Sequence, residues 1–285
     1  MESIFRKGLF QDRVALITGG GTGIGLRTAR ELAALGATVV LAGRKQEHLD
    51  RGCAAIKADG GEVHTVICNI RDEAAVINCI EETLTKTGRL DFLVNNAGGQ
   101  FPSPAEDINQ KGWHAVIDTN LTGTFTMTRE AFNRYFKENG GSVVNVIANM
   151  WRGFPMMAHT GAARAGVDNL TKTLAVEWGR YGVRVNAVAP GVIQSSGLAR
   201  YGPEFQPLVQ STAAFNQTSR LGTEAEVAAA IVFLLSPAAA FITGETVKID
   251  GGDSLYNPLL PPKKNDCNPP YDHEPQKKRE FNHKK

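Results

Sequence analysis

Short runs rich in valine and isoleucine alternate with longer helical patterns, and this alternation limits the possible folds of the chain most strongly. The helical patterns cover residues 24–36, 47–60, 72–88, 120–139 and 161–179. The seven apolar runs cover residues 13–19, 37–43, 62–69, 91–98, 141–148, 183–191 and 245–252. They lack a regular polar alternation, which is typical of parallel strands covered by helices on both faces. The order predicts an α/β fold with a doubly wound, parallel, seven-stranded sheet.

Composition narrows the class of protein. The chain has 285 residues, of which 42% are hydrophobic, which suits a single large domain. A net charge of +2 gives no reason to expect a nucleic-acid partner. The longest apolar run, near residue 230, is too short to cross a membrane, and no secretory or peroxisomal signal is visible. We expect a cytoplasmic protein without a metal site, since the cysteines lack ligand spacing: Cys53, Cys68, Cys79 and Cys267.

The composition changes near residue 256. Residues 256–285 contain six of the 13 prolines together with lysine clusters, which is typical of a solvated tail or of an arm that wraps a neighbouring subunit. We therefore expect a domain at residues 1–255, with a substrate-covering loop at 195–218, followed by this tail.

A glycine-rich motif, TGGGTGIG at residues 18–25, joins the first expected strand to the first expected helix. In this context Gly19 permits a tight turn, Gly23 lets a pyrophosphate approach the backbone, and Gly25 allows close packing of the helix. Amide groups near Ile24 would then bind the anion at the helix N-terminus. The motif, which includes Thr22, predicts a Rossmann-type dinucleotide site.

The end of the second strand indicates which dinucleotide binds. An acidic residue there would accept from the ribose 2′-hydroxyl of NAD, but Gly43 takes that place and Arg44 and Lys45 follow it. A guanidinium without a competing carboxylate suits a 2′-phosphate, so Arg44 favours NADP(H).

These motifs, followed by NNAGG (95–99), NLTGTF (120–125) and RVNAVAPGVI (184–193), resemble the short-chain dehydrogenase/reductase family over residues 8–255. The resemblance implies a homotetramer built partly through the helix that contains Arg164. It also implies the following sites: Asn69 and Ile70 at the adenine, Asn96, Ala97 and Gly98 at the ribose, Asn120 at a local helix break that anchors a water, and Pro190, Gly191, Ile193 and Ser195 at the nicotinamide.

The chain departs from the family at the residues that move protons. The usual serine is replaced by Ala148, the tyrosine by Thr160 and the lysine by Arg164. Thr160 and Arg164 are one helical turn apart, so Arg164 can still donate to the nicotinamide ribose, although an ion pair with Asp168 is an alternative. Thr160 cannot supply a proton readily near neutral pH, so a ketone reductase would lack its acid.

Reduction of a conjugated double bond needs this acid less, because charge collects on a thioester oxygen that positioned donors can hold. Motifs such as HTGAARAGV (159–167) and DGGDSLY (250–256) resemble the peroxisomal trans-2-enoyl-CoA reductase branch and bacterial citronellol or citronellal dehydrogenase-like proteins. We expect NADPH-dependent reduction of a trans-2-enoyl thioester. Two alternatives remain: an NAD(P)-dependent alcohol or aldehyde dehydrogenase acting on a terpenoid such as citronellol, and an inactive dinucleotide-binding sensor.

Two residues are candidate proton donors. Tyr201 lies in the expected substrate loop, and His159 adjoins Thr160 and titrates near neutrality. Phe205, Leu208 and Phe215 of the same loop are candidates to line an acyl pocket.

Overall fold

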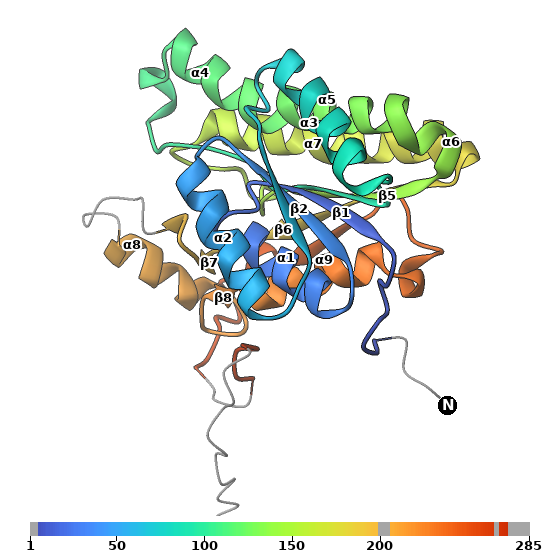
Figure 1. Ribbon diagram of the computed structural model, residues 1–285. Coiled ribbons are helices and arrows are strands. Elements are labelled where there is room, and N and C mark those ends of the chain that lie inside the picture. The colour runs from blue at the N-terminus through green and yellow to red at the C-terminus, as the bar shows by residue number, and fades with distance from the viewer. Residues whose placement is uncertain (1–4, 199–205, 265–267, 273–285) are drawn as a thin grey trace, which may run out of the picture.

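The computed structural model describes residues 5–198, 206–264 and 268–272 and forms a three-layer α/β domain (Figure 1). Its central sheet has seven parallel strands in the order β3-β2-β1-β4-β5-β6-β9, which confirms the predicted Rossmann-type sheet. The strands are β1 (Val14–Thr18), β2 (Thr38–Gly43), β3 (Val63–Ile67), β4 (Phe92–Asn95), β5 (Gly141–Val146), β6 (Val183–Pro190) and β9 (Thr246–Ile249).

Helices cover both faces of the sheet (Figure 1). One layer holds α1 (Gly23–Ala34), α2 (Gln46–Ala58) and α9 (Glu224–Leu235), and the other holds α3 (Glu73–Thr87), α4 (Gln110–Ile117), α5 (Gly123–Ala131), α6 (Lys137–Asn139) and α7 (Ala158–Trp178). Three apolar clusters fill the interfaces, and two of them are large. Leu32 and Ile231 belong to the first, and Ile80, Met127 and Trp178 belong to the second. Because the central strands β1, β4, β5 and β6 are buried on both faces, their sequences show no polar alternation.

The strand order reverses at β1, which pairs with β2 on one side and with β4 on the other. The chain connections therefore run outward in two directions, and in sheets of this kind a crevice is expected beyond the carboxyl ends of the two strands, here β1 and β4. Ligands of open α/β sheets bind at such a point. The glycine-rich turn at residues 19–23 lies there.

Two helical segments differ from the sequence prediction. The run expected at 120–139 begins ten residues earlier, at Gln110, and continues through α4, α5 and α6 with π-helical turns between them. Helix α9 was not predicted, because Ala225, Val227, Ala228, Ile231, Val232 and Leu234 are all buried and leave no polar face to give a helical period. None of the helices formed by the described residues is long and apolar enough to span a membrane.

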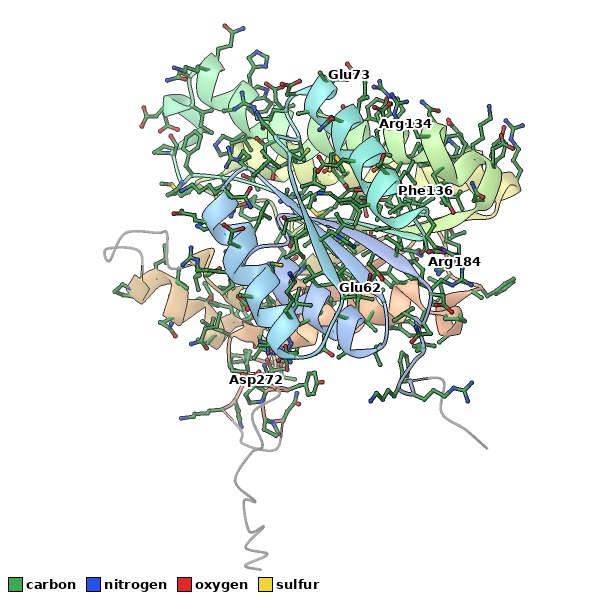
Figure 2. The ribbon with its side chains drawn as sticks, viewed as in Figure 1. Glu62, Glu73, Arg134, Phe136, Arg184 and Asp272 are labelled. Carbon is green, nitrogen blue, oxygen red and sulfur yellow. The ribbon has the colours of Figure 1, made fainter. Side chains whose placement is uncertain are left out.

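Arg184 of β6 links the C-terminal end of α9 to the sheet by hydrogen bonds (Figure 2). Its guanidinium donates to the carbonyl oxygens of Leu234 at 2.8 Å and of Ile242 and Leu235 at 3.3 Å. These carbonyls lie at or beyond the helix C-terminus and have no partner inside the helix. The Arg184 side chain therefore donates to several carbonyl oxygens that lack a partner within the helix.

The segment after β6 is held at both ends. Strand β7 (Ile193–Gln194) pairs in parallel with β8 (Gly222–Thr223), and α8 (Gln206–Ser211) lies between them in the sequence.

Part of the C-terminal tail also packs on its own chain. Thr223 Oγ1 donates to the carbonyl oxygen of Tyr271 at 2.7 Å, and Asp272 pairs with Arg27 of α1 at 3.3 Å (Figure 2). Residues 268–272 therefore contact α1 and the start of α9.

Candidate active site

The glycine turn is built around close backbone contacts. Gly19 has φ of +64°, and a Cβ there would lie 2.9 Å from Asn96 Nδ2. A Cβ on Gly25 would lie 2.5 Å from both Asn96 Nδ2 and the carbonyl oxygen of Gly19. Asn96 Nδ2 in turn donates to the carbonyl oxygen of Thr18 at 3.0 Å. The turn between β1 and α1 thus needs glycine, and it brings Asn96 and Ala97 beside it.

The N-terminus of α1 has no side-chain cap. Thr22 occupies the N-cap position with an extended backbone, and its side chain makes no capping hydrogen bond. Gly23 follows with φ of +59°, and the nearest atoms to a Cβ there would be Ser196 Oγ at 3.3 Å and Glu224 Oε1 at 3.5 Å. The amides around Ile24 are therefore available for an anion. These glycines and free amides fit a dinucleotide pyrophosphate.

Glu224 lies beside the glycine turn, and the sequence analysis did not single it out. Its carboxylate accepts from the backbone amide of Ser196 at 3.3 Å, next to Gly23. Burial raises the pKa of Glu224, and the hydrogen bond from Ser196 and the charge of Arg27 oppose that rise. A partly buried carboxyl thus adjoins the expected position of two phosphates. Only the fold brings it there, since Glu224 is about 200 residues from Gly23 in the sequence.

The expected adenosine end lies at the ends of β2 and β3. Gly43 ends β2, and the exposed Arg44 makes no hydrogen bond or ion pair with any described residue. Ile70 is buried against α5, because a Cβ on Gly123 would lie 2.9 Å from Ile70. Asn69 Oδ1 accepts from the amide of Arg71 at 3.3 Å. The structure thus leaves the Arg44 guanidinium free for a phosphate.

Asn120 lies in a π-helical turn, Asp118–Thr122, between α4 and α5. Its Nδ2 donates to the carbonyl oxygens of Gly99 at 2.7 Å and Val116 at 2.9 Å, and its Oδ1 accepts from the amide of Gly99 at 3.2 Å. The helix is therefore locally widened at Asn120. The fully buried side chain binds the loop after β4 to the helix rather than pointing into open space.

Arg164 is buried beneath this loop. Its Nη1 donates to the carbonyl oxygen of Val146 at 2.9 Å, and a Cβ on Gly98 would lie 2.6 Å from Nη2 and 2.8 Å from Asn120 Oδ1. Gly98, Asn120 and Arg164 therefore meet at one point. Burial lowers the pKa of Arg164 to about 10, so the group stays charged at neutral pH.

The alternative ion pair between Arg164 and Asp168 does not form. Asp168 pairs with Lys172 and accepts from Thr246 Oγ1 at 2.6 Å instead. No carboxylate among the described residues forms an ion pair with Arg164, and its Nε has no partner there. A buried, unpaired cation is costly unless a ligand or a developing charge compensates it.

Thr160 and His159 lie one turn before Arg164 and are both fully buried. His159 Nδ1 accepts from the amide of Thr160 at 2.8 Å and lies 3.3 Å from Thr160 Oγ1. Burial lowers the pKa of His159, and its ring meets Phe101 edge-on at 4.6 Å between centroids. His159 is therefore a neutral, packed side chain at physiological pH, which disfavours the proton-donor role.

The remaining predicted residues lie at the other end of the crevice. Pro190 ends β6, Gly191 donates to the carbonyl oxygen of Ile249 at 2.9 Å, and Ile193 is buried at the start of β7. Leu208 and Phe215 are exposed on the segment after β7. Tyr201 and Phe205 lie outside the described residues. No cluster of three or more potential metal ligands occurs among the described side chains.

Comparisons with known proteins agree with this architecture. The family model described as enoyl-(acyl carrier protein) reductase matches residues 19–254. A probable 2,4-dienoyl-CoA reductase, (2E)-enoyl-CoA-producing, from Bacillus subtilis is 39% identical over 86% of this chain and 98% of its own. The peroxisomal 2,4-dienoyl-CoA reductase, (3E)-enoyl-CoA-producing, of Danio rerio is 36% identical over 87% of this chain and 84% of its own.

A solved structure is more similar still. The citronellol catabolism dehydrogenase AtuB of Pseudomonas aeruginosa PAO1 is 52% identical, covers 89% of this chain and 100% of its own, and superposes with a TM-score of 0.77. The family match begins at the glycine turn and spans the strands of the central sheet from β2 to β9. The chain belongs to the short-chain dehydrogenase/reductase family, a family of oxidoreductases that use a nicotinamide dinucleotide.

Proposed function

We propose that the protein reduces the C2–C3 double bond of a trans-2-enoyl thioester with NADPH. The observation that carries this proposal is the pair at the start of α7, where Arg164 is a buried cation without an ion-pair partner among the described residues and Thr160 offers no acid. Carbonyl reduction requires a proton on the oxygen that receives charge. Reduction of a conjugated thioester requires that charge to be held by donors instead.

NADPH is proposed as the cofactor because of the end of β2. Gly43 leaves no carboxylate to repel a 2′-phosphate, and Arg44 is exposed and uncommitted among the described residues. When bound, the nicotinamide would supply a hydride. Gly19, Thr22, Gly23, Ile24 and Gly25 would hold the pyrophosphate. The other proposed contacts are Asn69 and Ile70 at the adenine, Asn96, Ala97, Gly98 and Arg164 at the riboses, and Pro190, Gly191 and Ile193 at the nicotinamide.

Asn120, Thr160, Arg164 and Tyr201 are proposed on the substrate side. Asn120 keeps the loop after β4 in place, and Arg164 presents positive charge below it. Thr160 orients by its hydroxyl and supplies no proton. The segment 195–218 would cover the acyl group. The names of the 2,4-dienoyl-CoA reductase relatives support a conjugated acyl thioester as the substrate class.

A second candidate is oxidation of a terpenoid alcohol such as citronellol. The 52% identity to a citronellol catabolism dehydrogenase favours it. The two candidates differ in the bond that reacts, since the alcohol requires a base for its hydroxyl proton and Thr160 is a poor one.

One assay separates these reactions. Purified protein would be incubated with NADPH and crotonyl-CoA, hexenoyl-CoA, 2,4-hexadienoyl-CoA or citronellal, and with NADP⁺ or NAD⁺ and citronellol, while absorbance at the reduced-nicotinamide band is followed. We expect turnover with an enoyl-CoA. Turnover of only the citronellal and citronellol pair would refute the proposal. Tight NADPH binding without any turnover would indicate a dinucleotide sensor.

We also propose a homotetramer located in the cytoplasm, with a catalytic domain at 1–255 and a tail at 256–285. Ala162 and Ala165 are exposed on α7 and permit another helix to approach, whereas Gly161 already contacts Phe154 of its own chain. Light scattering at micromolar concentration and cell fractionation test the two assignments, and a monomeric mass would contradict the first.

A further inference from the structure

Residues 268–272 of the C-terminal tail, called the docked segment below, lie against the start of α9. Thr223 Oγ1 donates to the carbonyl oxygen of Tyr271 at 2.7 Å, and the amide of Tyr271 donates to Glu226 Oε1 at 3.2 Å. The side chain of Asp272 then pairs with α1 (Figure 2). The docked segment thus joins the two helices whose N-termini lie beside the glycine turn.

The sequence of the docked segment suits an arm that docks and detaches. Pro269 and Pro270 each fix a backbone φ angle, so docking restricts few torsions that were free before. All five residues remain exposed, and exposed polar contacts contribute little each. The bonds that hold the docked segment are therefore weak enough for a change of charge nearby to shift its docking.

Asp272 occupies one edge of Arg27, a cation of α1. Arg27 Nη1 lies 3.3 Å from Asp272 Oδ1, and Arg27 Nε donates to Glu31 of the same helix at 3.1 Å. Arg27 Nη2 is buried and has no hydrogen-bond partner among the described residues. A buried donor without a partner is costly. The guanidinium therefore keeps a donor unused while the docked segment is in place.

Glu224 is a further carboxylate that feels the charge of Arg27. Its Oε1 would lie 3.5 Å from a Cβ on Gly23, at the turn that fits the pyrophosphate. Burial is the largest influence on the pKa of Glu224 and raises it. The amide of Ser196 and the charge of Arg27 lower that pKa, whereas the charge of Asp272 raises it. Asp272 and Glu224 therefore compete for the positive charge of one arginine.

We propose that the docked segment is an inhibitory contact, which lowers the affinity for the dinucleotide because Asp272 occupies the cation that otherwise compensates Glu224. With Asp272 in place, the Glu224 carboxylate is only partly compensated beside the expected phosphates. With the segment detached, Arg27 compensates Glu224, and the pyrophosphate meets less negative charge. This inference rests on the dinucleotide site of the proposed function.

The effect has to be reciprocal. Two binding events that oppose each other do so by the same factor in both directions. Bound dinucleotide should therefore loosen the docked segment as much as the docked segment weakens dinucleotide binding. The amide hydrogen of Tyr271 reports this loosening, because the docked segment holds it in a hydrogen bond to Glu226.

The first test measures the dissociation constant of NADPH by fluorescence titration, in low salt and at a pH above the pKa of Glu224. Asp272→Asn should bind NADPH about threefold to fivefold more tightly than wild type, the size expected for one exposed ion pair. The gain should shrink in high salt, because the Asp272 side chain is 56% exposed and its charge is screened.

Asp59→Asn is the matched control. Asp59 is also an exposed carboxylate, and it lies 2.7 Å from Arg30 of the same helix, about one turn farther from Gly23 than Arg27. Its replacement should leave the affinity for NADPH unchanged. Circular dichroism establishes that each variant is folded.

Glu224→Gln separates the shared cation from a direct effect of the tail charge. In this background Asp272→Asn should change the affinity by no more than about 1.5-fold, because no carboxylate at residue 224 is left to compensate. An equal gain in both backgrounds would overturn the competition for Arg27.

Hydrogen exchange followed by mass spectrometry supplies the second readout. Saturating NADPH should speed exchange in the docked segment of the wild type by a factor comparable to the gain in affinity. Failure of both NADPH and NADH to bind the wild type would refute the proposed dinucleotide site. Wild-type binding together with an affinity that is unchanged or weaker in Asp272→Asn, or with exchange that NADPH does not speed, would refute the inhibitory contact alone.

Discussion

Arg164 of α7 and Val146 at the carboxyl end of β5 are joined by a hydrogen bond of 2.9 Å from the guanidinium to the carbonyl oxygen. The bond fixes the cation at the crevice while leaving Nε without a partner among the described residues. Replacing Arg164 should therefore remove charge from the proposed reacting centre. We expect Arg164→Met to lower kcat/KM for an enoyl-CoA by about 10²-fold or more, since one preorganised donor contributes this much.

The isosteric change Thr160→Val is its matched control, because it removes only a hydroxyl near His159. We expect Thr160→Val to stay within about fivefold of wild type, given the size of a neutral hydrogen bond. Steady-state kinetics measure both variants. Equal losses in the two would show that Thr160 does more than orient.

Arg44 should determine the choice between NADPH and NADH. Arg44→Ala removes the cation next to the expected 2′-phosphate, so KM for NADPH should rise about tenfold or more while KM for NADH stays unchanged. Lys45→Ala, one residue further, should have the smaller effect. An equal rise for both cofactors would contradict the assignment.

Glu224 should make cofactor binding depend on pH. Its pKa is raised by burial, and its ionised form places negative charge beside Gly23, where the pyrophosphate is expected. Affinity for NADPH should therefore weaken as pH rises through the pKa of Glu224, by about fivefold for roughly 1 kcal/mol of repulsion. Glu224→Gln should bind more tightly above that pKa and show no such trend. Fluorescence titration across pH measures this, with the exposed Glu138→Gln as control.

Arg184 should matter for stability. Arg184→Met leaves the carbonyl oxygens of Leu234, Leu235 and Ile242 without their donor. The free energy of unfolding should fall by roughly 2–4 kcal/mol, as expected for the loss of charged hydrogen bonds to partly buried acceptors. Chemical denaturation measures the change. Arg180→Met, which removes an exposed guanidinium stacked on Tyr181, should change stability far less.

Deleting residues 256–285 should leave a folded domain. The deletion removes the ion pair of Asp272 with Arg27 and the contacts of Tyr271 with Thr223 and Glu226. These are exposed interactions, each worth up to about 1 kcal/mol. We expect native circular dichroism and a melting temperature lowered by a few degrees. Loss of the folded state would place the domain boundary after residue 255.

The sequence was sufficient to predict the sheet, since all seven expected strands form and lie in one parallel sheet. A strand that is buried on both faces appears in the sequence as a short, continuous apolar run, and such a run can be recognised without knowing the rest of the fold. Helix α9 gave no such pattern, because a helix surrounded by core has no polar side. The spacing of the glycines likewise predicted a tight turn. In the structure Gly19 and Gly25 lie so close to Asn96 that neither position has room for a Cβ.

The polar partners inside the crevice were beyond sequence reasoning. Asp253 meets Asn149 across about 100 residues, and Glu224 reaches Gly23 across about 200. Contacts of this kind depend on where the loops place their residues in space, and the periodicity of a sequence does not reveal these positions. The sequence did show which groups were missing, since Ala148 and Thr160 stand where a serine and a tyrosine are usual. The sequence could not show which side chains lie beside Ala148 and Thr160.

The pairing of β7 with β8 has a consequence for how this enzyme changes over time. Gln194 and Thr223 are neighbours, so the two ends of the segment between them lie side by side, and inside the segment the amide of Gln217 donates to the carbonyl oxygen of Gly251 at 2.7 Å. An insertion anchored this way can change length at little energetic cost, about 0.6 kcal/mol for each doubling. Exchanging residues 195–221 for the matching segment of a relative should thus alter the preferred substrate without disturbing the central sheet. The central sheet can therefore stay the same among related proteins while the segment 195–221 changes.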